Sequence, residues 1–160
     1  MAQNVYLELS GATQGPINGD STRVGNENHI ECVYYQHDLI VPVSKGSGQA
    51  TGRRRHGPII VRKRIEKASP KLTLALINNE LVAGTFRFFR PSPSSGVEEH
   101  FFTVQIEGGR VVSLKQVVPD TFVPATASQP PLEEAWFVFA RITWTIADGN
   151  ITTTDTVDTT

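Results

Sequence analysis

RHGPIIVRKRIEKASPKLTLAL, residues 55–76, is the stretch on which the arrangement of the whole chain depends. Near its start, Gly57-Pro58 is a turn signal. Residues 59–65 follow, and they are rich in β-branched side chains interleaved with bases, which predicts a strand. The bases are Arg62, Lys63 and Arg64. The first half of the stretch is therefore predicted to be a turn that leads into a strand.

The second half predicts the one convincing helix of the chain. The Ser69 side chain can accept hydrogen bonds from the free N–H groups of a first helical turn, and Pro70 has its φ preset for the first helical position. An apolar stripe follows at i, i+3 and i+4 spacing: Leu72, Ala75 and Leu76. Because Asn78-Asn79 suits a C-terminal cap, we expect a helix from Ser69 to Asn78 that covers part of a sheet.

Short strands are predicted over most of the remaining chain. Alternating apolar and polar residues, or apolar runs bounded by turn signals, indicate strands at residues 5–9, 30–35, 38–43, 81–90, 97–106, 111–118 and 136–147. A short extra strand is expected near Ile17. Gly108-Gly109 predicts a tight hairpin between two of the strands. The threonine-rich residues 151–160 are expected to be a polar terminal strand or tail.

The longest predicted strand is 136–147. Alternation places Trp136, Ile142 and Trp144 on one of its faces. It places Phe137 and Phe139 on the opposite face. Roughly seven to nine short strands with regular turn signals predict a mainly β fold, a compact antiparallel barrel or sandwich with one flanking helix. At 160 residues, the chain is expected to be a single domain, 1–160, large enough to bury a real core.

The segment from Ser44 to Gly57 is predicted to be a long exposed loop, because its glycine, serine and arginine residues leave it nothing to bury. A connection of this length inside a compact domain is usually functional or disordered. Its glycines lack the spacing of a phosphate-binding loop, and no helix follows them. The candidate contact residues of this loop are Lys45, Gly48, Gly52, Arg53, Arg54, Arg55 and His56.

Charge is unevenly distributed along a chain whose net charge is only −1. Residues 45–67 hold eight bases against the single acid Glu66, whereas six acids and the single base Arg141 follow Val118. This asymmetry suits either a surface for nucleic acid or two halves of a contact between copies of the chain. Aromatic residues that could stack on bases are not interleaved with Arg53–Arg55, which favours a solvated or subunit-facing loop.

No pattern for catalysis or for a cofactor stands out. Glu98-Glu99-His100 offers metal-ligating side chains, but neighbours on a strand point to opposite faces. The pair Glu133-Glu134 is expected to face water. Cys32, the single cysteine, is expected to be a buried and inert thiol, which fits synthesis in a reducing compartment. We find no Sec-type signal and no apolar run long enough for a transmembrane helix.

The opening stretch also resembles a known family. Its pattern is His56-x-Pro58 followed by Lys63-x-Ile65-x-Lys67-x-Ser69-Pro70-x-Leu72. This is similar to the signature of the haemolysin co-regulated protein (Hcp) family, the tube proteins of bacterial type VI secretion systems. Further similarities in order along the chain are Gly11, Gly15 and Gly19, then Gly48 and Gly52, then Phe86 to Arg90, then Glu134 ahead of Phe137, Phe139, Ile142 and Trp144. Glu66, the triple arginine and the threonine-rich tail depart from the family pattern.

The resemblance implies a compact β-barrel with one flanking helix, six copies of which form a ring. Rings stack into a hollow tube that carries effector proteins and is propelled by a sheath with a spike at its tip. It implies no catalysis, no cofactor, no nucleic acid and no membrane insertion. The subunit is expected to assemble in the bacterial cytoplasm and to be exported without a Sec signal. The loop with Arg53, Arg54 and Arg55 is expected to make ring-on-ring contacts.

Two other function classes remain open at this point. A small β-barrel module would bind nucleic acid through Arg53–Arg55 with steep salt dependence. A small hydrolase or metal protein would use His100 with Glu98 or Glu99.

Overall fold

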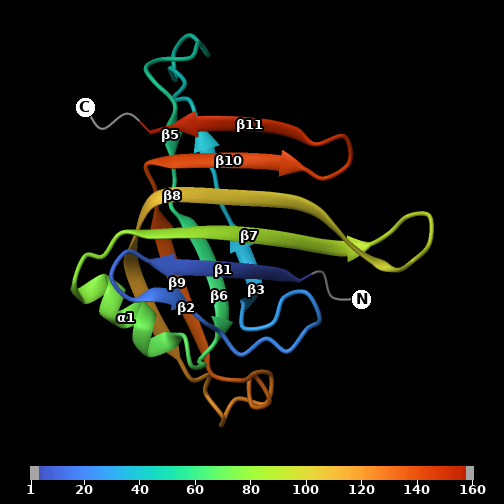
Figure 1. Cartoon of the computed structure of the whole chain (residues 1–160). Helices are drawn as coiled ribbons and strands as arrows, with labels where there is room; N and C mark the ends of the chain where they lie inside the picture. The colour runs from blue at the N-terminus through green and yellow to red at the C-terminus, as the bar shows by residue number, and fades with distance from the viewer. Residues whose placement is uncertain (1–3, 158–160) are drawn as a thin grey trace.

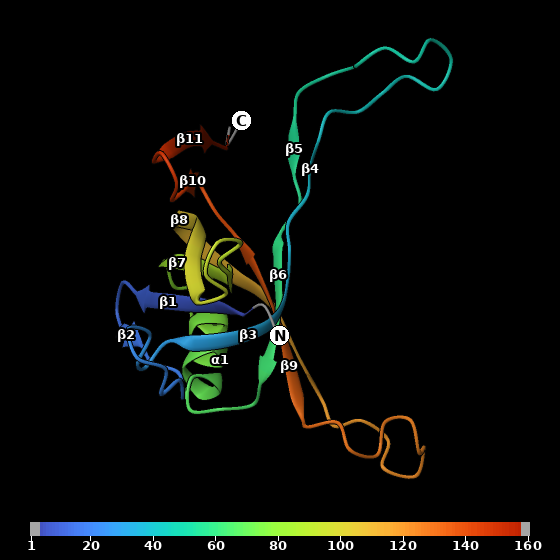
Figure 2. The same cartoon turned by 90° about the vertical axis from the view of Figure 1, so that its right-hand side faces the viewer.

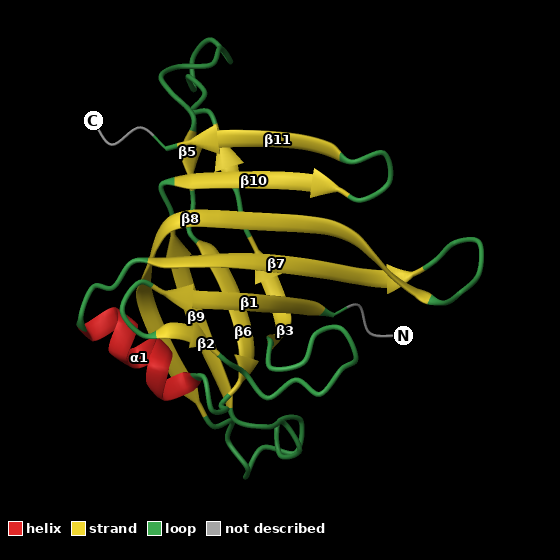
Figure 3. Ribbon diagram, in the orientation of Figure 1, coloured by secondary structure: helices red, strands yellow, loops and turns green. Residues whose placement is uncertain are grey.

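The computed structural model describes residues 4–157. In this part of the chain there are eleven strands and one helix (Figure 3). They are β1 (Val5–Gly11), β2 (Gly15–Ile17), β3 (Ile30–Gln36), β4 (Leu39–Ile40), β5 (Arg55–His56), β6 (Ile59–Arg64), α1 (Ser69–Ile77), β7 (Val82–Pro91), β8 (Glu98–Val117), β9 (Leu132–Val138), β10 (Arg141–Ile146) and β11 (Ile151–Thr156). The last three residues of the predicted tail lie outside the described range, and the rest of it includes β11.

The main sheet closes into a barrel. Its strand order is β11-β10-β8-β7-β1-β3-β6-β9, and the second half of β8 pairs with β9, so the strands from β8 to β9 form a closed ring (Figure 1). All these pairings are antiparallel, and β10 and β11 extend the sheet beyond the closed part. The mainly β barrel with a single helix is therefore confirmed.

The predicted hairpin at Gly108-Gly109 is wrong, because β8 runs through both glycines as one strand of 20 residues. Residues before the glycines pair with β7 and β10, and residues after them pair with β9. Gly108 has a φ of 59°, and a Cβ on Gly109 would lie 3.0 Å from the backbone oxygens of Val82 and Val138. The two glycines thus bend the strand where it changes partners, as glycine does at barrel corners.

The predicted long strand 136–147 is also wrong, because it is divided between β9 and β10 at Phe139-Ala140. The Ala140 N–H donates to the Glu107 carbonyl over 3.0 Å. At this point the chain passes from β9, which pairs with the second half of β8, to β10, which pairs with the first half. The break shifts the alternation by one residue. Phe137, Phe139 and Ile142 consequently all lie in the core, although alternation placed them on two faces.

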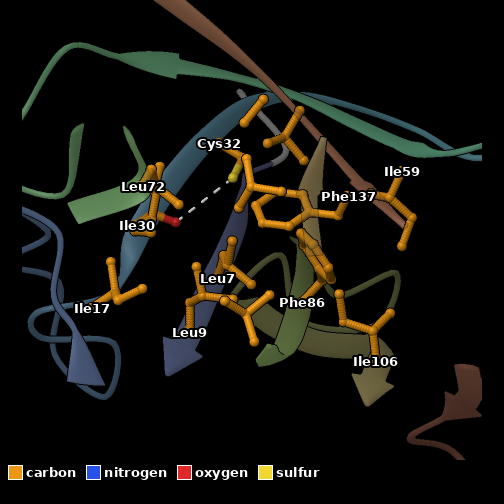
Figure 4. Packing of buried hydrophobic residues seen from close by; sticks show 14 of the residues in the cluster. Leu7, Leu9, Ile17, Ile30, Cys32, Ile59, Leu72, Phe86, Ile106 and Phe137 are labelled. Atoms are coloured by element: carbon orange, nitrogen blue, oxygen red, sulfur yellow. Dashed lines mark hydrogen bonds between the residues drawn. The ribbon is translucent and has the colours of Figure 1, made fainter. Parts of the chain in front are cut away.

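The core fills the barrel and the space beneath α1. Figure 4 shows Leu7, Phe86 and Phe137 among the side chains gathered there. Leu72 and Ala75 of α1 are buried against the same cluster and Leu76 is partly buried, which confirms the predicted apolar stripe. Cys32 is buried as expected. Burial raises the pKa of its thiol to about 12, so the group stays protonated and inert.

The helix starts differently from the prediction. Ala68 is the N-cap residue, and the Ser69 hydroxyl makes no capping hydrogen bond to the first turn. Instead it accepts a bond of 3.1 Å from the backbone N–H of Glu66, so it fixes the turn before the helix. The C-terminal end is as predicted, with Asn78 as the cap and Asn79 in the left-handed region at a φ of 51°.

Candidate functional site

A projecting hairpin dominates one end of the molecule (Figure 2). We call residues 37–57 the arm. Its two sides pair as β4 and β5, which form a separate two-stranded sheet, and a further bridge joins Val43 to Ala50. The segment predicted to be a long exposed loop, residues 44–57, is exposed over residues 45–55, and it forms the tip and the second side of this hairpin, which includes β5.

The surface of the arm combines apolar and basic side chains. Four apolar residues are 44–59% exposed: Leu39, Ile40, Val41 and Val43. The bases Lys45, Arg53 and Arg55 are also exposed along it. Gly48 and Gly52 have positive φ values, 69° and 84°, and no atom lies within 4 Å of the position of a Cβ at either residue. These glycines therefore allow the turns of the arm and are not required by a close contact. Apolar residues gathered on an exposed protrusion are typical of a protein–protein contact.

The root of the arm is packed against the barrel through His56. Its side chain is only 6% exposed, and its Nε2 lies 2.7 Å from Asp155 Oδ2 on β11. Its Nδ1 lies 3.3 Å from Nε2 of His37, and the two rings are nearly parallel. Phe139 and Trp144 contact the same imidazole, with ring centroids 5.3 and 6.2 Å away. His56 therefore joins the arm to the body of the protein and does not form part of an exposed loop tip.

Arg54 makes the second connection to Asp155. The Nε and Nη2 atoms of Arg54 donate to the two carboxylate oxygens over 2.7 and 2.6 Å, and Nη2 also donates to the Thr156 carbonyl over 3.3 Å. Arg54 first, and then His56, lower the pKa of Asp155 far below its ordinary value. Asp155 is consequently a carboxylate at neutral pH, held by two groups of the arm.

The other signature residues lie at the barrel wall and α1. Lys63 is completely buried, with Nζ 3.0 Å from Oε1 of Glu133, 3.0 Å from the Ser69 hydroxyl and 3.2 Å from the Arg64 carbonyl. Glu133 is equally buried, so the prediction that it faces water was wrong. Gln116 donates to its Oε2 over 2.7 Å.

The remaining signature positions have structural surroundings of the same kind. Pro58 precedes β6, Pro70 lies in the first turn of α1, and Leu72 is in the core. Lys67 makes a long ion pair of 3.8 Å with Asp20 at the surface. From Pro58 onward the signature thus marks how the helix is attached to the barrel, whereas its first residue, His56, belongs to the root of the arm.

Intrachain ion pairs account for part of the charge asymmetry. Three of the eight bases in residues 45–67 pair with acids of the C-terminal third: Lys63 with Glu133, Arg62 with Glu134 and Arg54 with Asp155. The complementarity seen in the sequence is therefore satisfied in part within one chain.

The alternative metal cluster is dispersed. Glu98 pairs with Arg23, Glu99 with Arg90, and the His100 ring with the Thr103 hydroxyl. Between residues 4 and 157, no group of three or more His, Cys, Asp or Glu side chains is arranged to hold a metal ion. The one helix in that range, α1, is not long and apolar enough to cross a membrane.

Asp155, His37 and Trp144 are the residues that sequence reasoning did not connect with the arm. Asp155 is separated from Arg54 by 101 positions. The available signal was the alternation of strand residues, which puts Arg54 and His56 on one face of the chain and Arg53 and Arg55 on the other.

Comparison with known proteins gives consistent matches along nearly the whole chain. The family model described as type VI secretion system effector, Hcp, matches residues 6–146. A major exported protein of Pseudomonas aeruginosa PAO1 is 32% identical over 155 residues, covering 91% of this chain and 90% of that protein. A crystal structure of an Hcp protein has a TM-score of 0.88 at 26% identity, covering 97% and 98% of the two chains. A variant of Hcp1 from E. coli EAEC 042 has a TM-score of 0.83 at 29% identity, covering 95% and 97%.

Proposed function

The chain belongs to the Hcp family of type VI secretion system proteins, and we propose that it is a structural subunit of the inner tube of such a system. In this proposal six copies form a ring, and rings stack through the arm into a hollow tube. The tube assembles in the cytoplasm and is exported with the effectors it carries. Sheath and spike proteins of the same system are its further partners, and the subunit itself performs no catalysis.

The observation that carries the proposal is the chemistry of the arm. Four consecutive or nearly consecutive apolar residues are exposed on a hairpin that stands away from the barrel. An exposed apolar ribbon is costly in water unless a partner covers it. In a ring or tube the contacts are heterologous, so the arm of one copy meets a different surface of the next copy.

The nucleic-acid alternative is less well supported. Arg54, the centre of the triple arginine, is bound to Asp155, and Arg62 is bound to Glu134. A phosphate backbone would have to compete with these carboxylates.

Electron microscopy of the purified full-length chain tests the proposal. Wild-type protein is expected to show six-fold rings with an open centre, and stacked rings at high protein concentration. Charge reversal by Arg53→Glu with Arg55→Glu should reduce stacking and leave rings intact. The control, Lys67→Glu with Lys71→Glu, makes the same charge change at the start of α1 and should stack normally. Monomers in the wild-type sample would refute the tube, and unchanged stacking of the arm variant would refute the role of the arm.

A further inference from the structure

We propose that Asp155 latches the arm to the edge strand β11, and that this latch fixes the direction in which the arm leaves the barrel. The inference rests on the proposed function only in assigning the arm to ring stacking. The latch itself is a property of the isolated subunit.

Backbone pairing alone holds the arm weakly. Its two sides share the register pairs Leu39 with His56 and Ile40 with Arg55, and they form a sheet separate from that of the barrel. An isolated two-stranded ribbon is marginally stable in water. The β3–β6 ladder of the main sheet reaches Gln36 and Ile60 and stops at the root of the arm, so side chains there can add to what fixes its direction.

The root side chains converge on a single carboxylate. Both oxygens of Asp155 are engaged, Oδ1 by Arg54 and Oδ2 by Arg54 and His56, at distances from 2.6 to 2.7 Å. Arg54 and His56 are two positions apart, so they project from the same face of the extended chain. The bidentate contact of Arg54 and the contact of His56 together restrict both the rotation and the separation of the second side of the arm relative to β11.

The two contacts of the latch have different surroundings. Phe139 and Trp144 lie against His56 and His37, so one side of the cluster is apolar. The His56 side chain is 6% exposed, which protects its contact with Asp155 from water, whereas the Arg54 side chain is 48% exposed and its ion pair is partly screened.

Few charged groups lie near the two imidazoles. The charged and titratable groups that face the two imidazoles are Asp155, Arg54 and Asp38. With both rings neutral, one donor order satisfies all contacts, because His37 Nε2–H donates to His56 Nδ1 and His56 Nε2–H donates to Asp155.

The latch couples two distant segments of the chain. Within residues 4–157, strand β11 pairs only with β10, so its outer side is an edge of the described sheet. Any contact that orders the arm will therefore also order β11, and the converse holds because coupling between two sites is reciprocal.

Hydrogen exchange of the full-length chain, followed by mass spectrometry, tests the latch. Asp155→Asn keeps the shape of the side chain and removes its charge. Amide exchange over residues 38–57, which include the N–H groups of Thr51 and Gly57, is expected to become at least about tenfold faster. The control Asp148→Asn removes a charge from the turn between β10 and β11, where the described residues provide Asp148 with no ion pair, and should leave exchange unchanged.

A double variant separates a latch from general loosening. His56 also packs against Phe139 and Trp144, so the second change is made at Arg54. If Arg54 and Asp155 act as one contact, Arg54→Gln with Asp155→Asn should exchange no faster than Asp155→Asn alone. Equal exchange in the Asp155 and Asp148 variants would overturn the latch, whether or not the protein forms tubes. Failure of the wild-type protein to form tubes would refute the proposed function and leave the exchange result to decide the latch.

Discussion

Lys63 Nζ and Glu133 Oε1 lie 3.0 Å apart in the barrel wall, and both side chains are almost completely excluded from water. They face each other as cross-strand partners of β6 and β9. The neighbouring cross-strand pair, Arg62 with Glu134, is at the surface with side chains 47% and 24% exposed. Two ion pairs in adjacent register positions thus differ mainly in burial.

The buried pair should be far more sensitive to loss of one partner. Lys63→Met leaves the Glu133 carboxylate buried without its cation, and we expect a loss of about 3–5 kcal/mol in the free energy of unfolding. Arg62→Met, the matched control, should cost less than about 1 kcal/mol because water solvates Glu134. Urea unfolding at one fixed protein concentration measures both.

The double variant Lys63→Met with Glu133→Leu should recover part of the loss, since it removes the buried Glu133 charge but leaves Glu66, 4.0 Å from Lys63 Nζ, without that cation. Equal losses for Lys63→Met and Arg62→Met would contradict this account of the barrel wall.

Gly108 tests the bend in β8. Its φ is 59°, and a Cβ there would lie 2.9 Å from the Ala140 Cβ, whereas Gly96 has a φ of 70° and open space around it. Gly96→Ala should cost only the backbone strain of the left-handed region, roughly 1–2 kcal/mol. Gly108→Ala should cost about 1–3 kcal/mol more, because two methyl groups would overlap. Thermal unfolding of both variants measures the difference, and equal midpoints would show that the bend can move away from Ala140.

Stability should fall as the pH is lowered through the range of histidine titration. Burial first, and the charge of His56 second, lower the pKa of His37 in the folded protein. Below the unfolded value of about 6.5 the unfolded chain therefore binds more protons than the folded chain, which favours unfolding. Asp155 does not contribute in this window, because its lowered pKa means that its contribution is lost only in stronger acid.

Thermal unfolding between pH 7.5 and pH 5.5 checks this expectation. His37→Gln removes one titrating group, so its loss of stability over this interval should be smaller than that of the wild type. The remaining slope is expected from His29 and His100, whose pKa values burial also lowers. An identical slope in both proteins would rule out His37 as a contributor.

Local patterns predicted the helix and most of the strands correctly because their signals lie within a few residues. Leu72 and Ala75 enter the core as their spacing requires. Lys63 also had a usable signal, since it shares the strand face of Ile59 and Val61, both of which are buried. Because Lys63 stands between Arg62 and Arg64, the three bases form one charged run in the sequence, and the burial of Lys63 was not predicted.

The features that were missed depend on distant partners. Two adjacent glycines suit a tight hairpin and a barrel bend equally well, and the bend prevails because β8 has β9 as a partner beyond Gly109. The break at Ala140 goes with the hydrogen bond from its N–H to the Glu107 carbonyl. The attachment of the arm to β11 goes with the contact between His56 and Asp155. No local pattern encodes such contacts.

The exposed apolar side chains of the arm should matter for assembly and not for folding. Val43 is 59% exposed on the arm, and Val97 is 68% exposed before β8, away from the arm. Val43→Ser and Val97→Ser remove the same methyl groups from similarly exposed positions, so each should change the free energy of unfolding by less than about 0.5 kcal/mol. Only Val43→Ser removes apolar area that we propose a second copy covers, and it should therefore shorten stacked tubes in electron micrographs while six-fold rings persist. Equal tube lengths for the two variants would show that the arm docks through its charges alone, whereas loss of rings in Val43→Ser would place the arm in the contact within a ring.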